Sequence, residues 1–79
     1  MSPTVLRIRG FRPYFFSDEE QRPHVHVRHA DGHAKFWLTP EVRLTLSSGL
    51  RRHHLTAARR IVEEHRDEIL AKWKAHLAG

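Results

Sequence analysis

Hydrophobic and polar residues alternate through most of the first half of the chain, and this is the period of a strand with one buried face. The aromatic segment Phe11–Phe16 is also typical of a strand, and the alternation itself covers Thr4–Arg9 and Glu41–Leu46. In the last segment it places Val42, Leu44 and Leu46 on the inner side. The clearest stretch is residues 22–39, RPHVHVRHADGHAKFWLT. The pattern therefore predicts four to five short strands within residues 4–46.

Glycine, proline and serine mark where these strands end. Arg9-Gly10 or Gly10-Phe11 is suited to a tight hairpin turn. Pro13 lacks a backbone donor, which favours an edge strand or a bulge at that position. The segment Ser17–Pro23 reads as a polar loop, and Ser47–Gly49 reads as a turn.

The pair Asp31-Gly32 is the strongest hairpin signal in the chain. A two-residue turn there would pair Ala30 with His33, Arg28 with Lys35, Val27 with Phe36, His26 with Trp37, and Val25 with Leu38. One face of the hairpin would then carry Val25, Val27, His29, Ala34, Phe36 and Leu38. The other, called the basic face below, would carry His24, His26, Arg28, His33, Lys35 and Trp37. Like charges directly opposite each other are destabilising, so we expect Arg28 and Lys35 to be solvated or to bind an anion.

Apolar residues recur every three or four positions through the last third of the chain, which is the period of an amphipathic helix. The stripe comprises Leu55, Ala58, Val62, His65, Ile69, Trp73 and His76. It stays in phase throughout, so it favours one long helix over residues 51–77, with a kink allowed near His65, rather than two packed helices. The predicted fold class is α+β, with a small antiparallel sheet packed on one face by this helix. No segment remains to cover the basic face.

Length and composition narrow the class of protein. The chain has 79 residues, which is enough for one domain over residues 1–79. It contains no cysteine, which excludes disulfides and thiolate metal sites and suits a reducing compartment. No apolar run approaches the roughly 20 residues that span a bilayer, and the N-terminus lacks the apolar core of a signal peptide. We therefore expect a cytoplasmic protein that does not insert into membranes.

The charge balance favours acidic partners. Fourteen Lys and Arg residues against nine Asp and Glu residues give a net charge of +5 with the eight histidines neutral. Such a balance suits nucleic acid or an acidic protein. A second basic cluster lies at the start of the helix, where cations oppose the helix dipole; it comprises Arg51, Arg52, His53 and His54, and Arg59 and Arg60 continue it. This local cost suggests that the cluster binds phosphate or an acidic partner, and the alternative is a solvated face.

The basic face also suggests chemistry. In a metal-independent ribonuclease, His24 or His26 would act as general acid or base and Arg28 and Lys35 would stabilise charge on the phosphate. Trp37 would stack on an unpaired base, and His33 would add to the nucleic-acid or anion binding of the face. The weaker alternative is a metal site made of His24, His26 and His33. Zinc generally takes four ligands, or three and an open position, and the face carries no carboxylate, so we expect no metal and no other cofactor.

Several segments together resemble a known bacterial family. They are PTVLRIRGFRPYFFS, RPHVHVRH, AKFWL and IVEEHRDEILAKW, and their most specific elements are P-H-x-H-V at Pro23–Val27 and H-R-x-E-I-L-x-x-W at His65–Trp73. In this order, over about residues 3–77, the chain resembles the family catalogued as domain of unknown function 4160. The resemblance implies a neighbour-encoded partner from the family domain of unknown function 2442, and a pair that looks like a toxin–antitoxin module. It brings no catalytic residues.

Three hypotheses follow. The first is a toxin–antitoxin component that binds RNA, DNA or an acidic partner protein through the basic face and the helix start, with ribonuclease activity as an extension. The second is a non-catalytic interaction module that pairs with a partner chain by strand addition. The third is a small histidine-based metal-binding domain.

Overall fold

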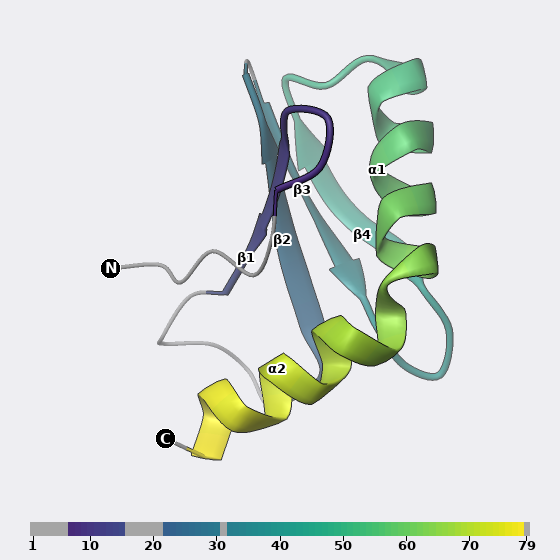
Figure 1. Ribbon diagram of the computed structural model, residues 1–79. Helices are drawn as coiled ribbons and strands as arrows, with labels where there is room; N and C mark the ends of the chain where they lie inside the picture. Colours follow the sequence, from purple (N-terminus) through teal and green to yellow (C-terminus); the bar gives the residue numbers. More distant parts are fainter. Residues whose placement is uncertain (1–6, 16–21, 31, 79) are drawn as a thin grey trace.

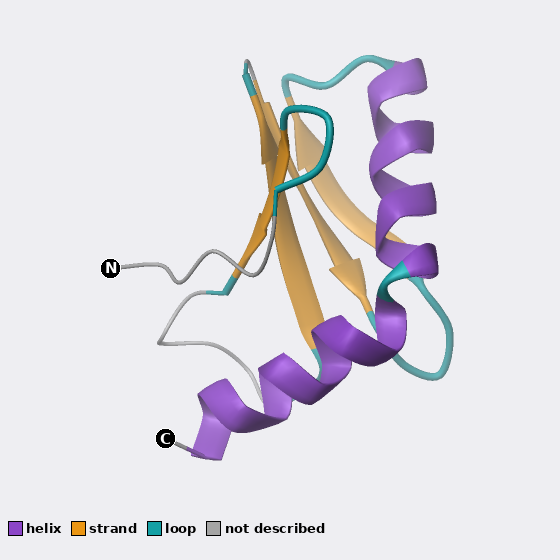
Figure 2. Ribbon diagram, viewed as in Figure 1, coloured by secondary structure: helices purple, strands orange, loops and turns teal. Residues whose placement is uncertain are grey.

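The computed structural model describes residues 7–15, 22–30 and 32–78 of the chain, and the account below is confined to them. The elements in chain order are β1 (Phe11–Tyr14), β2 (His24–His29), β3 (Gly32–Trp37), β4 (Arg43–Ser48), α1 (Arg52–Glu64) and α2 (Arg66–Ala78). The strands form one antiparallel sheet in the order β1-β2-β3-β4 (Figure 2). The predicted α+β class is confirmed.

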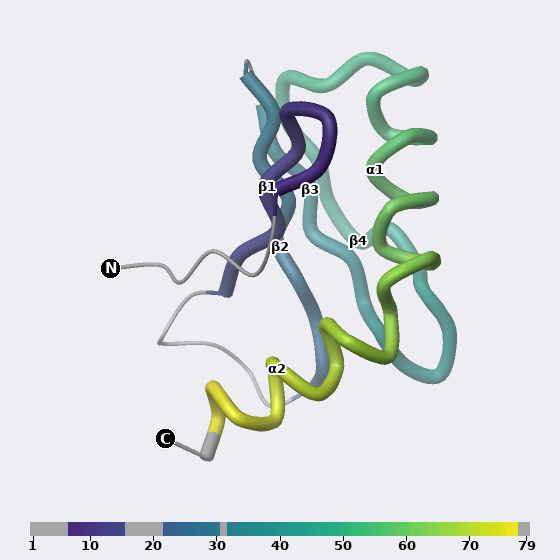
Figure 3. The backbone as a smooth tube through the Cα atoms, in the orientation of Figure 1, coloured from purple at the N-terminus to yellow at the C-terminus, as the bar shows by residue number. Residues whose placement is uncertain are grey.

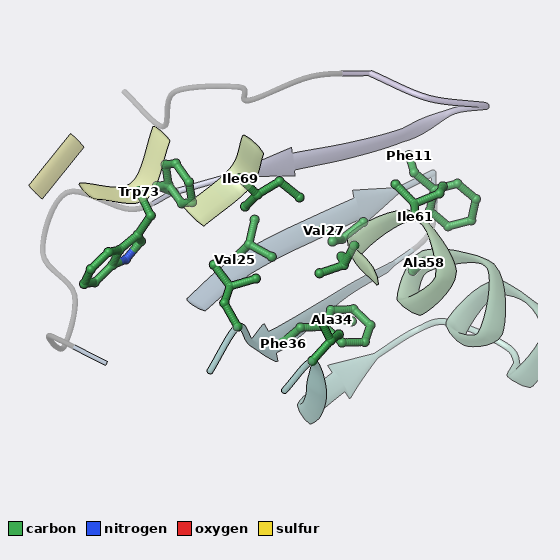
Figure 4. Packing of buried hydrophobic residues seen from close by; sticks show 13 residues of the cluster. Phe11, Val25, Val27, Ala34, Phe36, Ala58, Ile61, Ile69 and Trp73 are labelled. Carbon is green, nitrogen blue, oxygen red and sulfur yellow. The ribbon is translucent and has the colours of Figure 1, made fainter. Parts of the chain in front are cut away.

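Both helices pack on the same side of the sheet. Figure 1 shows α1 running alongside the strands and α2 crossing their far end. α1 contacts β3, and α2 contacts β2. The core between these layers takes its side chains from β1, β2 and β3, from residues that flank the strands, and from both helices (Figure 4). Val25, Val27, Phe36 and Leu38 are fully buried there, as the alternation predicts.

The β2–β3 hairpin pairs in a different register from the predicted one. His29 lies opposite Gly32, so the turn lies one residue earlier in the chain, and Arg28 faces His33 instead of Lys35. Position 32, the first residue of β3, requires glycine, because a Cβ there would come within 2.3 Å of the Ser48 carbonyl oxygen at the end of β4. The error shifts every pairing by two residues. A shift of two leaves each side chain on its predicted face, because sheet faces alternate with a period of two.

The hairpin before β1 agrees with the prediction. Arg9 and Gly10 have φ angles of +52° and +82°, and Ile8 and Phe11 exchange backbone hydrogen bonds of 2.9 and 2.8 Å. Two consecutive positive φ angles are typical of a two-residue turn whose twist matches the sheet. Among the strands within residues 7–15, 22–30 and 32–78, β1 lies at an edge of the sheet, as Pro13 predicts. Most of the predicted strand Thr4–Arg9 lies outside the described residues, as does Phe16.

β4 differs from the prediction in its inward-facing residues. Val42 is buried, but Leu44 is 39% exposed and Leu46 is 49% exposed. A register irregularity in β3 between Lys35 and Phe36 places Leu46 opposite Lys35 and Leu44 opposite Phe36. The two leucines therefore lie on opposite faces of an edge strand. β4 also continues through the two serines that the sequence assigned to a turn.

The predicted single helix is divided in two. α1 ends and α2 begins on either side of His65, whose φ and ψ angles are −111° and 17°, and the chain turns sharply there (Figure 3). A straight helix over residues 52–78 would be about 40 Å long, whereas a six-residue strand spans about 20 Å. The bend returns Ile69 and Trp73 to the sheet, where both are buried. It is held by Arg66, whose Nε donates a 2.7 Å hydrogen bond to the Leu38 carbonyl.

Candidate functional site

The basic face lies on the side of the sheet away from the hydrophobic core, and the strand register arranges it in three rows. The first row, at the hairpin end, contains Arg12, Arg28, His33 and Ser48. The second contains Tyr14, His26, Lys35 and Leu46, and the third contains His24, Trp37 and Arg43. Neighbouring strands lie about 4.8 Å apart, so each row brings side chains from separate strands within reach of one ligand.

The first row places two arginines and a histidine side by side. Arg12 lies directly opposite Arg28, and Arg28 lies opposite His33. Arg28 is exposed, and it forms no ion pair within the described part of the chain. The Arg12 guanidinium lies 5.4 Å from the centroid of the Tyr14 ring. The predicted repulsive pair of Arg28 with Lys35 is wrong, because the register places His33 opposite Arg28 on β3. The like charge opposite Arg28 is Arg12, on β1.

The second row is mostly buried, which corrects the expectation of an open face. Lys35 is 9% exposed and His26 is 7% exposed, so the prediction that Lys35 is exposed is wrong. The Tyr14 ring stacks on His26 with 5.4 Å between the centroids. His24 in the third row is 1% exposed, and its ring lies edge-on to Trp73 of α2 at 6.4 Å. The bend between the helices brings Trp73 to this end of the sheet, which the sequence pattern did not reveal.

Trp37 is half-buried and has two cations near its ring. The Arg22 guanidinium carbon is 4.2 Å from the ring centroid, and the Lys35 Nζ is 4.7 Å from it. Arg22 also donates a 3.0 Å hydrogen bond to the Thr39 carbonyl. Arg43, which faces Trp37 across the strands, is exposed and lies 3.4 Å from Glu41. Sequence analysis missed Arg22 and Arg43, since neither belongs to the predicted hairpin face.

The geometry argues against His24 and His26 as catalytic groups. The His24 Nδ1 lies 2.6 Å from the Arg22 carbonyl oxygen. Because a carbonyl oxygen only accepts, Nδ1 carries the proton of that bond. A general acid or base must reach the group that it protonates or deprotonates, and both imidazoles are buried. The accessible chemistry of the basic face is therefore anion binding at its two ends.

Comparison with known families matches residues 10–74 to a family described as a domain of unknown function, DUF4160. The chain belongs to the DUF4160 family. The matched range includes all four strands and most of both helices, and therefore the whole basic face. No curated protein and no solved structure matches the chain. Neither described helix is long and apolar enough to cross a membrane.

The structure of this DUF4160 chain does not gather the three histidines of the alternative metal site. His24 and His26 have ring centroids 5.5 Å apart, but His33 lies in the first row beside Arg28. Over residues 7–15, 22–30 and 32–78, no group of three His, Cys, Asp or Glu side chains is arranged to hold a metal ion.

Arg51 and Arg52 lie on the opposite side of the sheet from the basic face, because α1 covers the core. Both are exposed, and Arg51 caps α1 without a side-chain hydrogen bond. Beside them lie His53 and His54, which the sequence placed in the same basic cluster, and sequence analysis missed only that His29 of β2 joins them. The His53 and His54 ring centroids are 4.0 Å apart, and His54 and His29 are 4.5 Å apart. The predicted binding residues of this DUF4160 chain are thus divided between two surfaces.

Proposed function

We propose that this chain binds single-stranded nucleic acid through the two cationic ends of its basic face, as a component of a bacterial toxin–antitoxin pair in the cytoplasm. The observation that carries the proposal is the cross-strand pair of Arg12 and Arg28 next to His33. Like charges directly opposite each other cost stability. A phosphate group offsets that cost, because guanidinium groups bind phosphate oxygens in a two-point geometry.

Trp37 supports a single-stranded ligand over a duplex. An accessible aromatic ring can stack on an unpaired base, with little dependence on which base it is. Trp37 is half-buried, and Arg22 and Arg43 lie beside it to take flanking phosphates. The proposal concerns binding and does not include cleavage by His24 or His26, because both side chains are buried.

The test is titration of labelled single-stranded RNA and DNA with the protein, at a series of salt concentrations. Each phosphate contact contributes about 0.7 to the slope of log affinity against log salt for single strands. The double variant Arg12→Gln/Arg28→Gln should therefore bind more weakly and lower that slope by about 1.4. The matched control is Lys72→Gln/Lys74→Gln, which removes the same charge from exposed positions of α2 and should bind as the wild type does.

Two other outcomes would contradict nucleic-acid binding by the basic face. Equal weakening by both double variants would show that net charge, and not the basic face, attracts nucleic acid. No binding even at low salt, with loss of a neighbour-encoded partner protein in Arg12→Gln/Arg28→Gln, would replace nucleic acid by an acidic protein at the same face.

The toxin–antitoxin role rests on the family resemblance, which also implies a partner from the family domain of unknown function 2442. The test is to induce the gene with and without its chromosomal neighbour and to follow growth and RNA integrity. We expect growth arrest or its relief to depend on the presence of both genes. Growth that is the same in every combination would contradict the role without affecting the binding proposal.

A further inference from the structure

A groove of about 450 Å³ separates α1 from the turn that precedes β1. One wall is formed by Ile8 and Arg9, and the other by one side of the helix. Figure 1 shows this turn bending toward the N-terminal half of α1. The helix contributes residues spaced three or four apart, which places them on one face: His53, Thr56, Ala57, Arg60, Ile61 and Glu64. The groove lies on the helix side of the sheet and is separate from the basic face.

Two arginines stand on opposite walls of the groove. Arg9 is held in the hairpin turn with φ +52°, and Arg60 lies two helical turns from His53 on α1. Within the described residues, neither arginine has an ion pair or a side-chain hydrogen bond. The neighbouring arginine, Arg59, points to the other side of the helix, where its Nε lies 3.4 Å from Glu63. The groove therefore brings two cations and an imidazole together, and its lining also contains the Glu64 carboxylate.

The remaining lining is apolar in the middle and hydrogen-bonding at the far end. Ile8, Ala57 and Ile61 line the middle, and Glu64 and His65 close the end away from His53. A ligand that fits this order has an anionic group at one end, a body with an apolar face, and a hydrogen-bond donor at the other end. The volume lies within the range of small-molecule sites.

We propose that this groove binds a nucleoside monophosphate. Arg9, Arg60 and His53 hold the phosphate, and Ile8, Ala57 and Ile61 contact the sugar and the face of the base. The Glu64 carboxylate accepts a hydrogen bond from an amino or imino group of the base. This site is independent of nucleic-acid binding by the basic face, since the two share no residue.

The experiment is an NMR titration of the ¹⁵N-labelled full chain with AMP, CMP, GMP and UMP, and with inorganic phosphate and adenosine as partial ligands. We expect saturable shifts at Arg9 and along residues 53–65, weaker binding of inorganic phosphate, and the weakest binding of adenosine. The amide signal of Arg28 on the basic face should stay in place. Shifts confined to the basic face, or adenosine binding as tightly as AMP, would overturn the proposal. Absence of binding by all four nucleotides at millimolar concentration would do the same.

Two neighbouring arginines provide a matched pair of variants. Arg60→Gln should weaken the preferred nucleotide by about tenfold or more, because it removes a charged hydrogen-bond donor from the phosphate. Arg59→Gln removes the same charge one residue away, on the other side of α1, and should leave the affinity within about twofold, the range expected when only distant surface charge changes. If both variants weakened nucleotide binding equally, the effect would come from the overall charge of the protein, and the proposed site would be wrong.

A third variant tests the shape of the groove without changing its charge. Ala57→Leu fills the middle of the groove from a half-buried position and should abolish nucleotide binding while inorganic phosphate still binds. A thermal midpoint close to that of the wild type shows that this variant is folded. Unchanged nucleotide affinity in a folded Ala57→Leu protein would show that the nucleotide does not contact the middle of the groove, and would contradict the proposal. Arg12→Gln/Arg28→Gln should bind the nucleotide normally, so failure of one proposal leaves the other testable.

Discussion

The two faces of the sheet are built by the same strands with the same alternation, but they are buried in different ways. The helix-covered face is mostly apolar and is closed over β2 and β3, where Val25, Val27 and Phe36 are fully buried, whereas Leu44 of β4 is 39% exposed. The basic face is buried only in part: Lys35, His26 and His24 lie among aromatic rings, whereas Arg28 is exposed. Apolar side chains need only exclusion from water, whereas buried polar ones need specific partners. This difference makes the first face predictable from sequence and the second only partly so.

The largest expected effect lies on the helix-covered face. Phe36→Ala removes a fully buried ring from the centre of the core and should lower the free energy of unfolding by about 3–5 kcal/mol. In a domain of this size, that loss approaches the whole stability. Urea denaturation followed by circular dichroism measures it. A loss below about 1 kcal/mol, the ordinary effect of a point substitution, would show that Phe36 does not organise the core.

The buried part of the basic face, which includes His24 in the third row, should respond less strongly. His24→Ala removes the hydrogen bond to the Arg22 carbonyl and the ring contact with Trp73, and should cost about 2 kcal/mol. His33→Ala, on the same face but half-buried in the first row, should change stability by less than about 0.5 kcal/mol. Equal losses of unfolding free energy for the two substitutions in the same denaturation experiment would show that the buried and the exposed parts of this face do not differ.

The exposed end of the basic face should gain stability when its charge is reversed. Arg28→Glu places a carboxylate opposite Arg12 and beside His33, and should stabilise the fold by about 0.2–1 kcal/mol. The same variant should bind single-stranded nucleic acid more weakly than the wild type. A gain in stability with unchanged nucleic-acid affinity would show that the pair of Arg12 and Arg28 does not bind nucleic acid. A loss of stability would show that the two arginines do not repel each other in the folded protein.

The smallest effect lies on the outer side of the helices. The hydrogen bond from Lys72 and the contact with His65 lower the pKa of Glu68 below its usual value. A carboxyl with a lowered pKa in the folded state contributes stability above its unfolded pKa and loses it as pH falls through the folded value. The thermal midpoint of Glu68→Gln should therefore lie slightly below that of the wild type at neutral pH, and the two should converge in acid. A gap that widens in acid would contradict this sign.

The contribution of the sequence is clearest at the β2–β3 hairpin and the Arg9-Gly10 turn. Alternation assigned every hairpin residue to the correct face although the pairing was wrong by two residues, because a shift of two preserves the faces. The paired glycine and arginine of the first turn adopt the positive φ angles that their position requires. Arg28 and His33 of the candidate site followed from the same reasoning, whereas Lys35, on the correct face, is buried.

By itself, the sequence determined the α+β class, the two faces of the sheet and the apolar stripe of the helices, because these depend on periods of two and of three to four residues. Only the tertiary structure decided where the helix breaks, which polar residues are buried and where the groove lies. The bend at His65 follows from the limited length of the sheet, and it carries Trp73 to His24. The groove joins Arg9 to Arg60, which are far apart in the chain. Such contacts depend on how separate elements meet in space, and no local period encodes that.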